Sequence, residues 1–286
     1  MPQNEIVPAS YTEVSASSVE TWIRLRSSEP EFDFTFEAIK PGLFRTTFSS
    51  PSHPLPPFPS VKRPESSPES ITGTRDTESK TFQCPNGVEA KVTWKGVPLV
   101  TGGYTGEEPL HKDLPFRSYA VDGPGICHYT RYYRGHLHVG LGEKASPMDL
   151  SNRQFTLSAT DCFGYDALRS DPMYKHIPLL IKAGPEGVVG TFSTSHARGA
   201  YSVGSEMDGM WGFYKKYSQD FGGLEEYMMV GRTLEEVVTL YAELVGFPLL
   251  TPRWAYGYLA GGMMYSMLDE PRACDALMGF ASKLEK

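Results

Sequence analysis

Apolar and polar residues alternate along much of the chain up to Gly231, which predicts strands. Between residues 20 and 48 the pattern includes Phe32, Phe34 and Phe36, each separated by one other residue. A period of two with many aromatic rings is typical of half-buried strands. From Val88 onward, short segments of the same character are separated by turn residues: VEAKVTWKGVPLV, ICHYTRYYRGHLHVGLGE, FTLSATD, IPLLIKA, GVVGTFSTS and EEYMMVG. The pattern therefore favours a mainly β fold, an antiparallel β-sandwich.

Residues 49–81 interrupt this alternation with a Pro-, Ser- and charge-rich composition. Proline cannot donate a hydrogen bond to a sheet, and a polar segment of this kind buries little apolar surface. We expect a long exposed loop or linker here. Contact with a partner or a modification is a second, less favoured interpretation.

A helical pattern begins at Thr233. Thr233 and Glu236 have the spacing of a capping box, and apolar residues follow at positions 234, 237, 238, 241, 244 and 245. Gly246 is placed to cap the helix and Pro248 to stop it. The near-continuous apolar segment RWAYGYLAGG then predicts a buried strand. The pattern over residues 270–285 predicts a second helix. Together, the strand and this helix would form one βα unit at the end of the chain.

Composition excludes several classes of protein. The 286 residues carry 27 basic and 34 acidic side chains, a net charge of -7, and no basic cluster that would favour nucleic acid. Lys215-Lys216 is an isolated pair, which we expect to be solvated. The four cysteines are far apart and predict reduced thiols. No segment approaches the roughly 18 apolar residues of a membrane span, and the first residues do not resemble a signal peptide, so a cytoplasmic location is expected.

Histidine and serine motifs are weak here. His136 and His138 alternate within RGHLHVG and would share one face of a strand, but nearby residues supply no third metal ligand. We therefore expect hydrogen-bonded histidines and neither a metal site nor a cofactor. Ser195-His196 lacks the G-x-S-x-G turn of a serine hydrolase.

Carboxylates beside aromatic rings make a stronger candidate site. Asp161, Asp166 and Asp171 lie in SATDCFGYDALRSDP together with Phe163 and Tyr165. Carboxylates accept hydrogen bonds from sugar hydroxyls, and rings stack on the apolar face of a sugar. A polar loop with a packed tyrosine is an equally good interpretation of these residues alone.

Three motifs in one order resemble glycoside hydrolase family 31, which includes α-glucosidases, α-xylosidases, some α-galactosidases, transglucosylases and α-glucan lyases. They are the G-x-G-E turn at 140–143, Pro-x-Tyr-Lys-x-Ile-Pro at 172–178, and Leu-x-Gly-x-Pro-x-x-x-Pro-x-Trp-Ala-x-Gly-Tyr at 244–258. The resemblance extends over about residues 90–286.

The resemblance implies a galactose-mutarotase-like β-sandwich over residues 1–247, with the Pro/Ser-rich loop near 49–81, followed at 248–286 by the start of a (β/α)8 barrel. It implies that Asp161 binds substrate, and that Met263 and Tyr265 at the end of the first barrel strand line the sugar pocket. Many α-glucosidases have Arg-aromatic-x-Tyr at this strand end, whereas this chain has Gly262-Met263-Met264-Tyr265. The catalytic aspartates of the family lie on later barrel strands.

The resulting hypothesis is the N-terminal segment of a retaining α-glycosidase that acts on α-linked oligosaccharides or glycosides, inactive by itself. The expected partners are such a saccharide and the remaining portion of the barrel, with no nucleic acid and no membrane. The alternatives are a carbohydrate-binding or partner-docking β-sandwich without enzymatic activity, and part of an α-glucan lyase or transglycosylase.

Overall fold

The alternating segments fold into antiparallel strands in a computed structural model of the chain. The structure describes all residues except 1–4, 16–20, 59–66, 68–69, 258–266 and 285–286. The described residues form two units, Met1–Gly246 and Phe247–Lys286. Within the first unit, every strand pairing between named strands is antiparallel, as the sequence pattern predicts.

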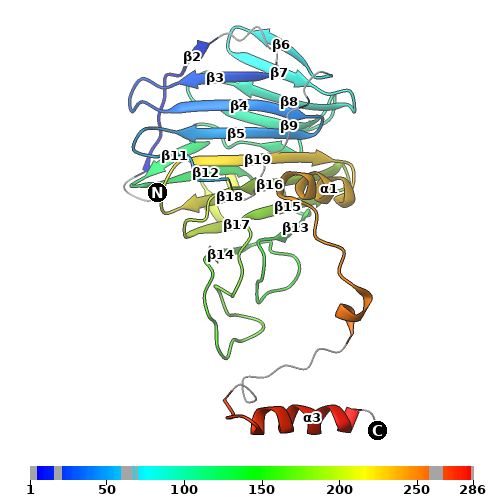
Figure 1. The fold of residues 1–286 in the computed structure, drawn as a ribbon. Helices are drawn as coiled ribbons and strands as arrows, with labels where there is room; N and C mark the ends of the chain where they lie inside the picture. The colour runs from blue at the N-terminus through cyan, green and yellow to red at the C-terminus, as the bar shows by residue number, and fades with distance from the viewer. Residues whose placement is uncertain (1–4, 16–20, 59–66, 68–69, 258–266, 285–286) are drawn as a thin grey trace. The chain divides into compact units, whose positions relative to one another are not determined.

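One layer of the first unit is an eight-stranded sheet (Figure 1). Its hydrogen-bonded order is β13 (Leu137–Gly140), β15 (Leu179–Gly184), β16 (Gly187–Ser193), β19 (Leu224–Gly231), β5 (Leu43–Ser49), β4 (Asp33–Lys40), β3 (Trp22–Arg26) and β2 (Thr12–Ser15). Strands β3, β4 and β5 come from the aromatic alternation between residues 20 and 48, which confirms that prediction.

Two smaller sheets form the facing layer. The six-stranded sheet has the order β1 (Glu5–Ile6), β11 (Tyr119–Asp122), β12 (Gly125–Arg131), β18 (Gly212–Gln219), β17 (Gly199–Asp208) and β14 (Arg153–Leu157). The five-stranded sheet has the order β10 (His111–Lys112), β9 (Leu99–Tyr104), β8 (Val88–Thr93), β7 (Ser79–Gln83) and β6 (Thr72–Asp76).

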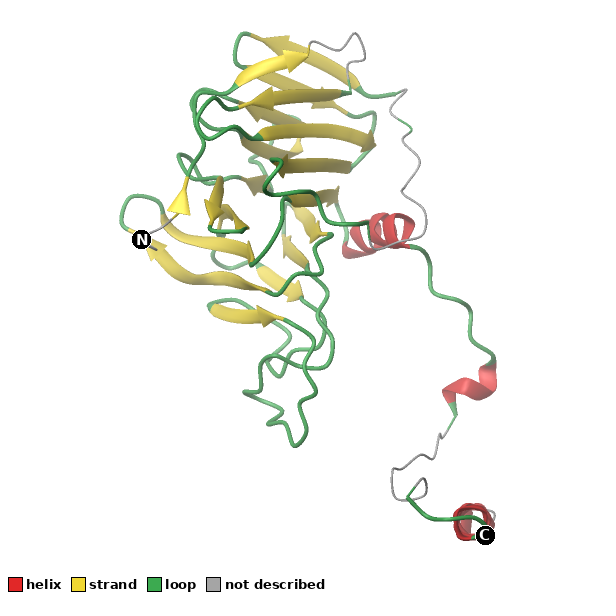
Figure 2. Ribbon diagram, turned by 60° about the vertical axis from the view of Figure 1, so that its left-hand side comes forward, coloured by secondary structure: helices red, strands yellow, loops and turns green. Residues whose placement is uncertain are grey.

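The strands of the first unit are stacked in layers (Figure 2), and aromatic rings from facing sheets pack together in the largest buried cluster. The Phe34 ring of β4 lies 5.3 Å from the Tyr119 ring of β11, and the Phe36 ring lies 5.2 Å from the Phe82 ring of β7. These four side chains are almost completely buried. Each fully buried aromatic side chain contributes about 1.5–3 kcal/mol by leaving water. The fold is thus the mainly β, antiparallel sandwich that the alternation predicts.

The prediction of a long exposed loop over residues 49–81 is wrong at its C-terminal end. Residues 72–76 and 79–83 form the β6–β7 hairpin. The hairpin is mostly polar, but two of its side chains point into the core. Phe82 is buried, and buried Lys80 donates to the Trp22 carbonyl at 2.9 Å. A lysine stem can cover apolar surface while its ammonium group finds a polar partner.

Helix α1 (Leu234–Val245) begins and ends where the capping residues predict. The Thr233 side chain accepts from the Glu236 amide at 3.2 Å, and the Gly246 amide donates to the Ala242 carbonyl at 2.8 Å. Val237 and Leu244 are buried in a cluster with residues of β16 and β19, so the helix covers the outer face of the eight-stranded sheet.

The second unit contains helix α3 (Arg272–Leu284), which confirms the helix predicted over 270–285. The strand predicted from Arg253 is wrong at its start, because Arg253–Tyr256 form a single 3₁₀ turn. A strand needs a neighbour for its backbone hydrogen bonds, and none of the described residues pairs with this turn. The barrel unit expected at 248–286 thus remains a prediction. Among the described residues, no helix has the length and hydropathy needed to cross a bilayer.

Candidate functional site

The loop between β14 and β15 carries Asp161, the substrate-binding residue expected in the sandwich. Residues 158–178 project beyond the edge strand β14 (Figure 1). Phe163 is 84% exposed and Tyr165 is 51% exposed, although both rings are apolar. A loop that presents aromatic rings to solvent is a candidate binding surface.

The base of the loop is fixed by one ion pair between a buried ammonium group and a partly exposed carboxylate. The Lys144 ammonium group, whose side chain is 3% exposed, donates to the Asp171 carboxylate at 3.0 Å and to the Thr156 carbonyl at 2.7 Å. The other Asp171 oxygen accepts from the Thr156 amide. These bonds connect residues 144, 156 and 171, so the start and end of the loop are held together.

The G-x-G-E turn packs against the end of the same loop. Gly142 has φ 78°, and a Cβ atom there would lie 2.8 Å from the Ile177 nitrogen. The Glu143 amide donates to the Lys175 carbonyl at 3.0 Å. Only glycine combines a positive φ with so close an approach. Two of the three motifs behind the family resemblance, at 140–143 and 172–178, therefore meet at one place in the fold.

The three loop carboxylates have different roles. Asp171 anchors the loop base, and Asp166 accepts from the Leu168 amide at 2.8 Å, which forms an Asx turn. The Asp161 side chain is exposed and accepts no hydrogen bond from any residue within the described parts of the chain. Partial burial, with the Asp161 charge as a smaller cause, raises the pKa of Tyr174. Asp161 is thus the loop carboxylate left free to accept hydrogen bonds from a ligand.

The flank of the loop has a polar hollow of about 340 Å³. Its lining includes Arg153, Gln154, Leu168, Arg169 and Asp171. Hydrogen-bond donors and acceptors beside an apolar side chain suit a hydroxyl-rich ligand. Met263 and Tyr265, the other expected pocket residues, lie outside the described residues.

A buried charge network, which no sequence pattern predicts, lies between the two layers. The Asp113 carboxylate lies 3.1 Å from His111 Nε2 and 3.0 Å from His128 Nε2, and it accepts from the Val100 amide at 2.8 Å. His128 Nδ1 lies 3.1 Å from the Glu226 carboxylate. Burial lowers the pKa of His128, but the Glu226 and Asp113 charges outweigh it and raise the pKa to about 10.

The ligand atoms of His111, Asp113 and His128 lie within 4.8 Å of one another, close enough to hold a metal ion. Both imidazole Nε2 atoms, however, lie at hydrogen-bond distance from the same Asp113 oxygen. A metal needs the nitrogen lone pairs, whereas these contacts use N–H groups. The Tyr119 ring also stacks on His128 at 4.5 Å. The arrangement fits a sealed electrostatic network.

The other predicted polar pairs separate in the fold. His138 is buried beside Ser151 and the Tyr132 ring, whereas His136 contacts Glu186. The prediction that Lys215-Lys216 is a solvated pair is wrong. Lys215 is only 4% exposed and lies in the core, and Lys216 donates to Glu5 at 2.9 Å. Neighbouring residues of a strand point to opposite faces, so the pair is split. All four cysteines are free thiols, as expected.

Comparisons with known proteins agree with this fold and with the motif order. A profile of the "Glycosyl hydrolase 31 N-terminal galactose mutarotase-like domain" matches residues 33–201. An alpha-glucosidase of Saccharolobus solfataricus is 32% identical over 134 residues, which cover 46% of this chain and 18% of that protein. The alpha-xylosidase XylQ of Lactiplantibacillus pentosus is 28% identical over 132 residues, 45% of this chain and 16% of that protein.

Solved structures share the fold at lower sequence identity. A cycloalternan-forming enzyme of Listeria monocytogenes, in complex with a pentasaccharide substrate, has a TM-score of 0.75 at 13% identity, covering 98% of this chain and 26% of that one. A dextranase of Flavobacterium johnsoniae, complexed with glucose, has a TM-score of 0.68 at 16% identity, covering 89% and 30%. This chain therefore spans less than a third of each of these relatives.

Proposed function

The chain belongs to glycoside hydrolase family 31 through its N-terminal galactose mutarotase-like domain, and we propose that it is the N-terminal segment of a retaining α-glycosidase acting on α-linked glycosides. The family match over residues 33–201 is the observation that carries this proposal. The names of the relatives support it, since they include an alpha-glucosidase and a dextranase.

In this proposal the β14–β15 loop contributes to the substrate site through Asp161. The carboxylate accepts hydrogen bonds from sugar hydroxyls, while exposed Phe163 and Tyr165 stack on the apolar faces of the sugar. The Lys144–Asp171 ion pair supports this role by holding the loop base. Met263 and Tyr265 are proposed to line the same sugar site, on the family resemblance alone.

Retaining hydrolysis requires two carboxyl groups about 5–5.5 Å apart, one as nucleophile and one as acid/base. In the described loop, Asp166 accepts a hydrogen bond from the Leu168 amide and Asp171 accepts one from the Thr156 amide of β14. On the family resemblance, which places both catalytic aspartates on later barrel strands, we assign the catalytic carboxylates to a part of the enzyme other than residues 1–286. The chain by itself binds and positions a saccharide without cleaving it.

An assay of the purified 286-residue chain with an aryl α-glucoside and an aryl α-xyloside tests this proposal. We expect no release of the aryl group above the rate in buffer, and no labelling by a mechanism-based glycosidase inactivator. A heat-denatured sample is the control. Heat-sensitive turnover, or stoichiometric labelling of a carboxylate in the chain, would contradict the assignment.

A carbohydrate-binding or partner-docking β-sandwich is the second candidate, favoured by the exposed aromatic rings of the loop. Like the first candidate, it predicts that the chain has no glycosidase activity by itself. The two candidates differ in whether the domain is part of an enzyme or acts only in binding. A place in a transglycosylase or an α-glucan lyase is a further alternative, and the cycloalternan-forming relative supports the former.

A further inference from the structure

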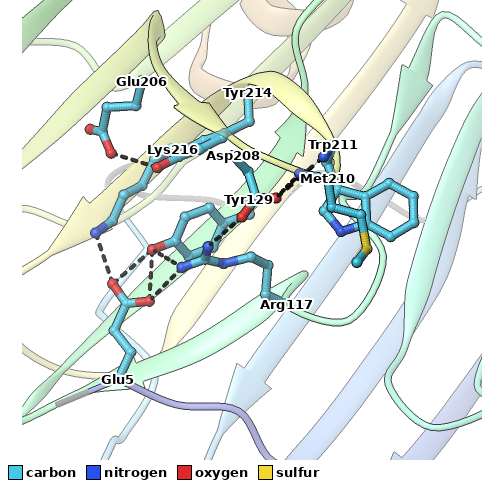
Figure 3. Close-up of polar contacts among 9 residues, drawn as sticks. All are labelled: Glu5, Arg117, Tyr129, Glu206, Asp208, Met210, Trp211, Tyr214 and Lys216. Atoms are coloured by element: carbon cyan, nitrogen blue, oxygen red, sulfur yellow. Dashed lines mark hydrogen bonds and ion pairs between the residues drawn. The ribbon is translucent and has the colours of Figure 1, made fainter. Parts of the chain in front are cut away.

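A second pocket lies on the outer face of the six-stranded sheet, away from the β14–β15 loop. It has a volume of about 490 Å³, within the range of roughly 300–1,000 Å³ that is typical of ligand pockets. Its lining includes Glu5, Phe116, Arg117, Asp208, Met210 and Trp211. These residues come from β1, from the segment before β11, and from the β17–β18 hairpin (Figure 3).

Arg117 forms the polar end of the pocket. Its guanidinium group lies over the Tyr129 ring at 4.3 Å, and its contacts with Glu5, the Tyr129 hydroxyl and Asp208 are 3.4, 3.4 and 3.5 Å long (Figure 3). Charge-assisted hydrogen bonds of arginine are normally about 2.7–2.9 Å. The cation is therefore held by its neighbours through long contacts, which shorter hydrogen bonds to a ligand can replace.

Two carboxylates surround this guanidinium group. Asp208 uses one oxygen to accept from the Met210 and Trp211 amides at 2.8 and 3.2 Å, and its other oxygen faces Arg117. The hydrogen bond from the Met210 amide lowers the pKa of Asp208, so the group stays ionised. Glu5 accepts from Tyr129 and Lys216 at 2.7 and 2.9 Å. The charges of these four ionised groups cancel, which disfavours an ionic ligand.

Aromatic and apolar side chains form the opposite rim. The Phe116 and Trp211 rings lie 5.7 Å apart with an angle of 38°, and Phe116 is 72% exposed. Phe116 also has φ 69°, a left-handed conformation that bulky residues rarely adopt. Such strain at an exposed ring indicates a functional constraint. Met210, 78% exposed, extends the same apolar surface.

We propose that this pocket is a second saccharide-binding site, which holds a short α-linked glucose oligosaccharide independently of the β14–β15 loop. The sugar stacks an apolar face on Trp211 and Phe116, and its hydroxyls donate to Asp208 and accept from Arg117. An apolar ligand would displace water from Arg117 and Asp208 without replacing the hydrogen bonds that the water makes. The ligand class rests on the proposed function, whereas the pocket itself does not.

Titration of the 286-residue chain with maltotriose and with isomaltotriose, followed by calorimetry and saturation-transfer NMR, tests the proposal. Trp211→Ala and Phe116→Gly should each weaken binding about 3- to 10-fold, the loss expected for one aromatic contact. Phe221→Ala is the matched control, because Phe221 is a 60% exposed ring that does not line the pocket. The β-linked cellotriose should bind more weakly.

Asp161→Asn separates the two saccharide sites, since it should leave the binding component that depends on Trp211 unchanged. Equal losses in Trp211→Ala and Phe221→Ala, or no saccharide binding in any protein, would overturn the second site. Dimerisation that Trp211→Ala abolishes would also overturn it, and would assign the pocket to another copy of the chain. The aryl-glycoside assay reports on the proposed function separately, because it does not depend on this pocket.

Discussion

The two faces of the β12–β18 strand pair carry two polar clusters, one buried between the sheets and one beside a cavity. His128 pairs with Tyr217 and Thr130 with Lys215 on the inner face, whereas Tyr129 pairs with Lys216 on the outer face. The inner cluster of His111, Asp113, His128, Lys215 and Glu226 is sealed between the sheets. The outer cluster of Glu5, Arg117, Tyr129 and Lys216 borders a cavity.

The difference shows what a polar cluster can do in each environment. In the inner cluster Asp113 lies at hydrogen-bond distance from His111 and His128, and His128 from Glu226, and all of these groups are buried away from any ligand. In the outer cluster Arg117 keeps long contacts and faces an opening. We infer that the inner cluster contributes to a specific core and the outer one to binding. Substitutions on the two faces should separate these roles.

The largest expected effect comes from His128→Ala. It leaves the Asp113 and Glu226 carboxylates buried without their shared cation, which costs about 3–5 kcal/mol. Lys216→Ala on the outer face is the matched control. It should cost about 1 kcal/mol, since Glu5 keeps Tyr129 and Arg117. Urea unfolding measures both, and equal losses would contradict the distinction between the faces.

Exchanging lysine and arginine at positions 215 and 117 should have the next largest effect on stability. Lys215→Arg inserts a larger group into a packed core and should destabilise the chain by about 1–3 kcal/mol. Arg117→Lys should cost no more than about 1 kcal/mol for the lost stacking on Tyr129, yet weaken maltotriose or isomaltotriose binding about 3-fold, because lysine lacks the planar donors. Urea unfolding and calorimetry distinguish the two. A destabilised Arg117→Lys with unchanged binding would reverse the assignment.

The smallest effect is a pH dependence specific to the inner face. The pKa of His128 is about 10 in the folded chain and 6.5 as the ordinary value, so its stabilisation is complete below pH 6.5 and is lost as the pH rises towards 10. The stability gap between the wild type and His128→Gln should therefore shrink by about 1 kcal/mol per pH unit between pH 7 and 8. Burial lowers the pKa of Lys215 to about 8, so Lys215 also titrates in this window, but it is present in both proteins and does not by itself create a gap.

Urea unfolding at several pH values measures that gap. Lys216→Ala is again the control, and its gap to the wild type should be flat over the same window, because the pKa of Lys216 is raised above 10.5. A gap for His128→Gln that stays flat over this window would show that His128 is neutral in the folded chain.

Sequence reasoning succeeded where a pattern depends on neighbours along the chain. The alternation around Phe34 and Phe36, and the capping residues Thr233 and Gly246, predicted real elements. It failed where glycines and charged residues interrupt the alternation of apolar and polar positions. The β17–β18 hairpin was missed because glycines and the Lys215-Lys216 pair interrupt its apolar positions.

For the candidate sites, the sequence shows which residue types are present but not which groups they bond to. It grouped Asp161, Asp166 and Asp171 as one acidic loop, and only their hydrogen bonds distinguish the free carboxylate from the two engaged ones. The second pocket had no sequence signal, because residue 5, residues 116–117 and residues 208–211 are far apart along the chain.

The sequence by itself determined the period-two strands, the capped helix and the order of motifs that identifies the family, because each is set by residues close together in the chain. The tertiary structure decided which charges are buried, which carboxylate is free and where cavities open. Those properties depend on partners that are distant along the chain: Lys215 is buried near Glu226 of another strand, and Arg117, which precedes β11, contacts Asp208 at the end of β17. Strand pairing brings such partners together, and no local pattern encodes it.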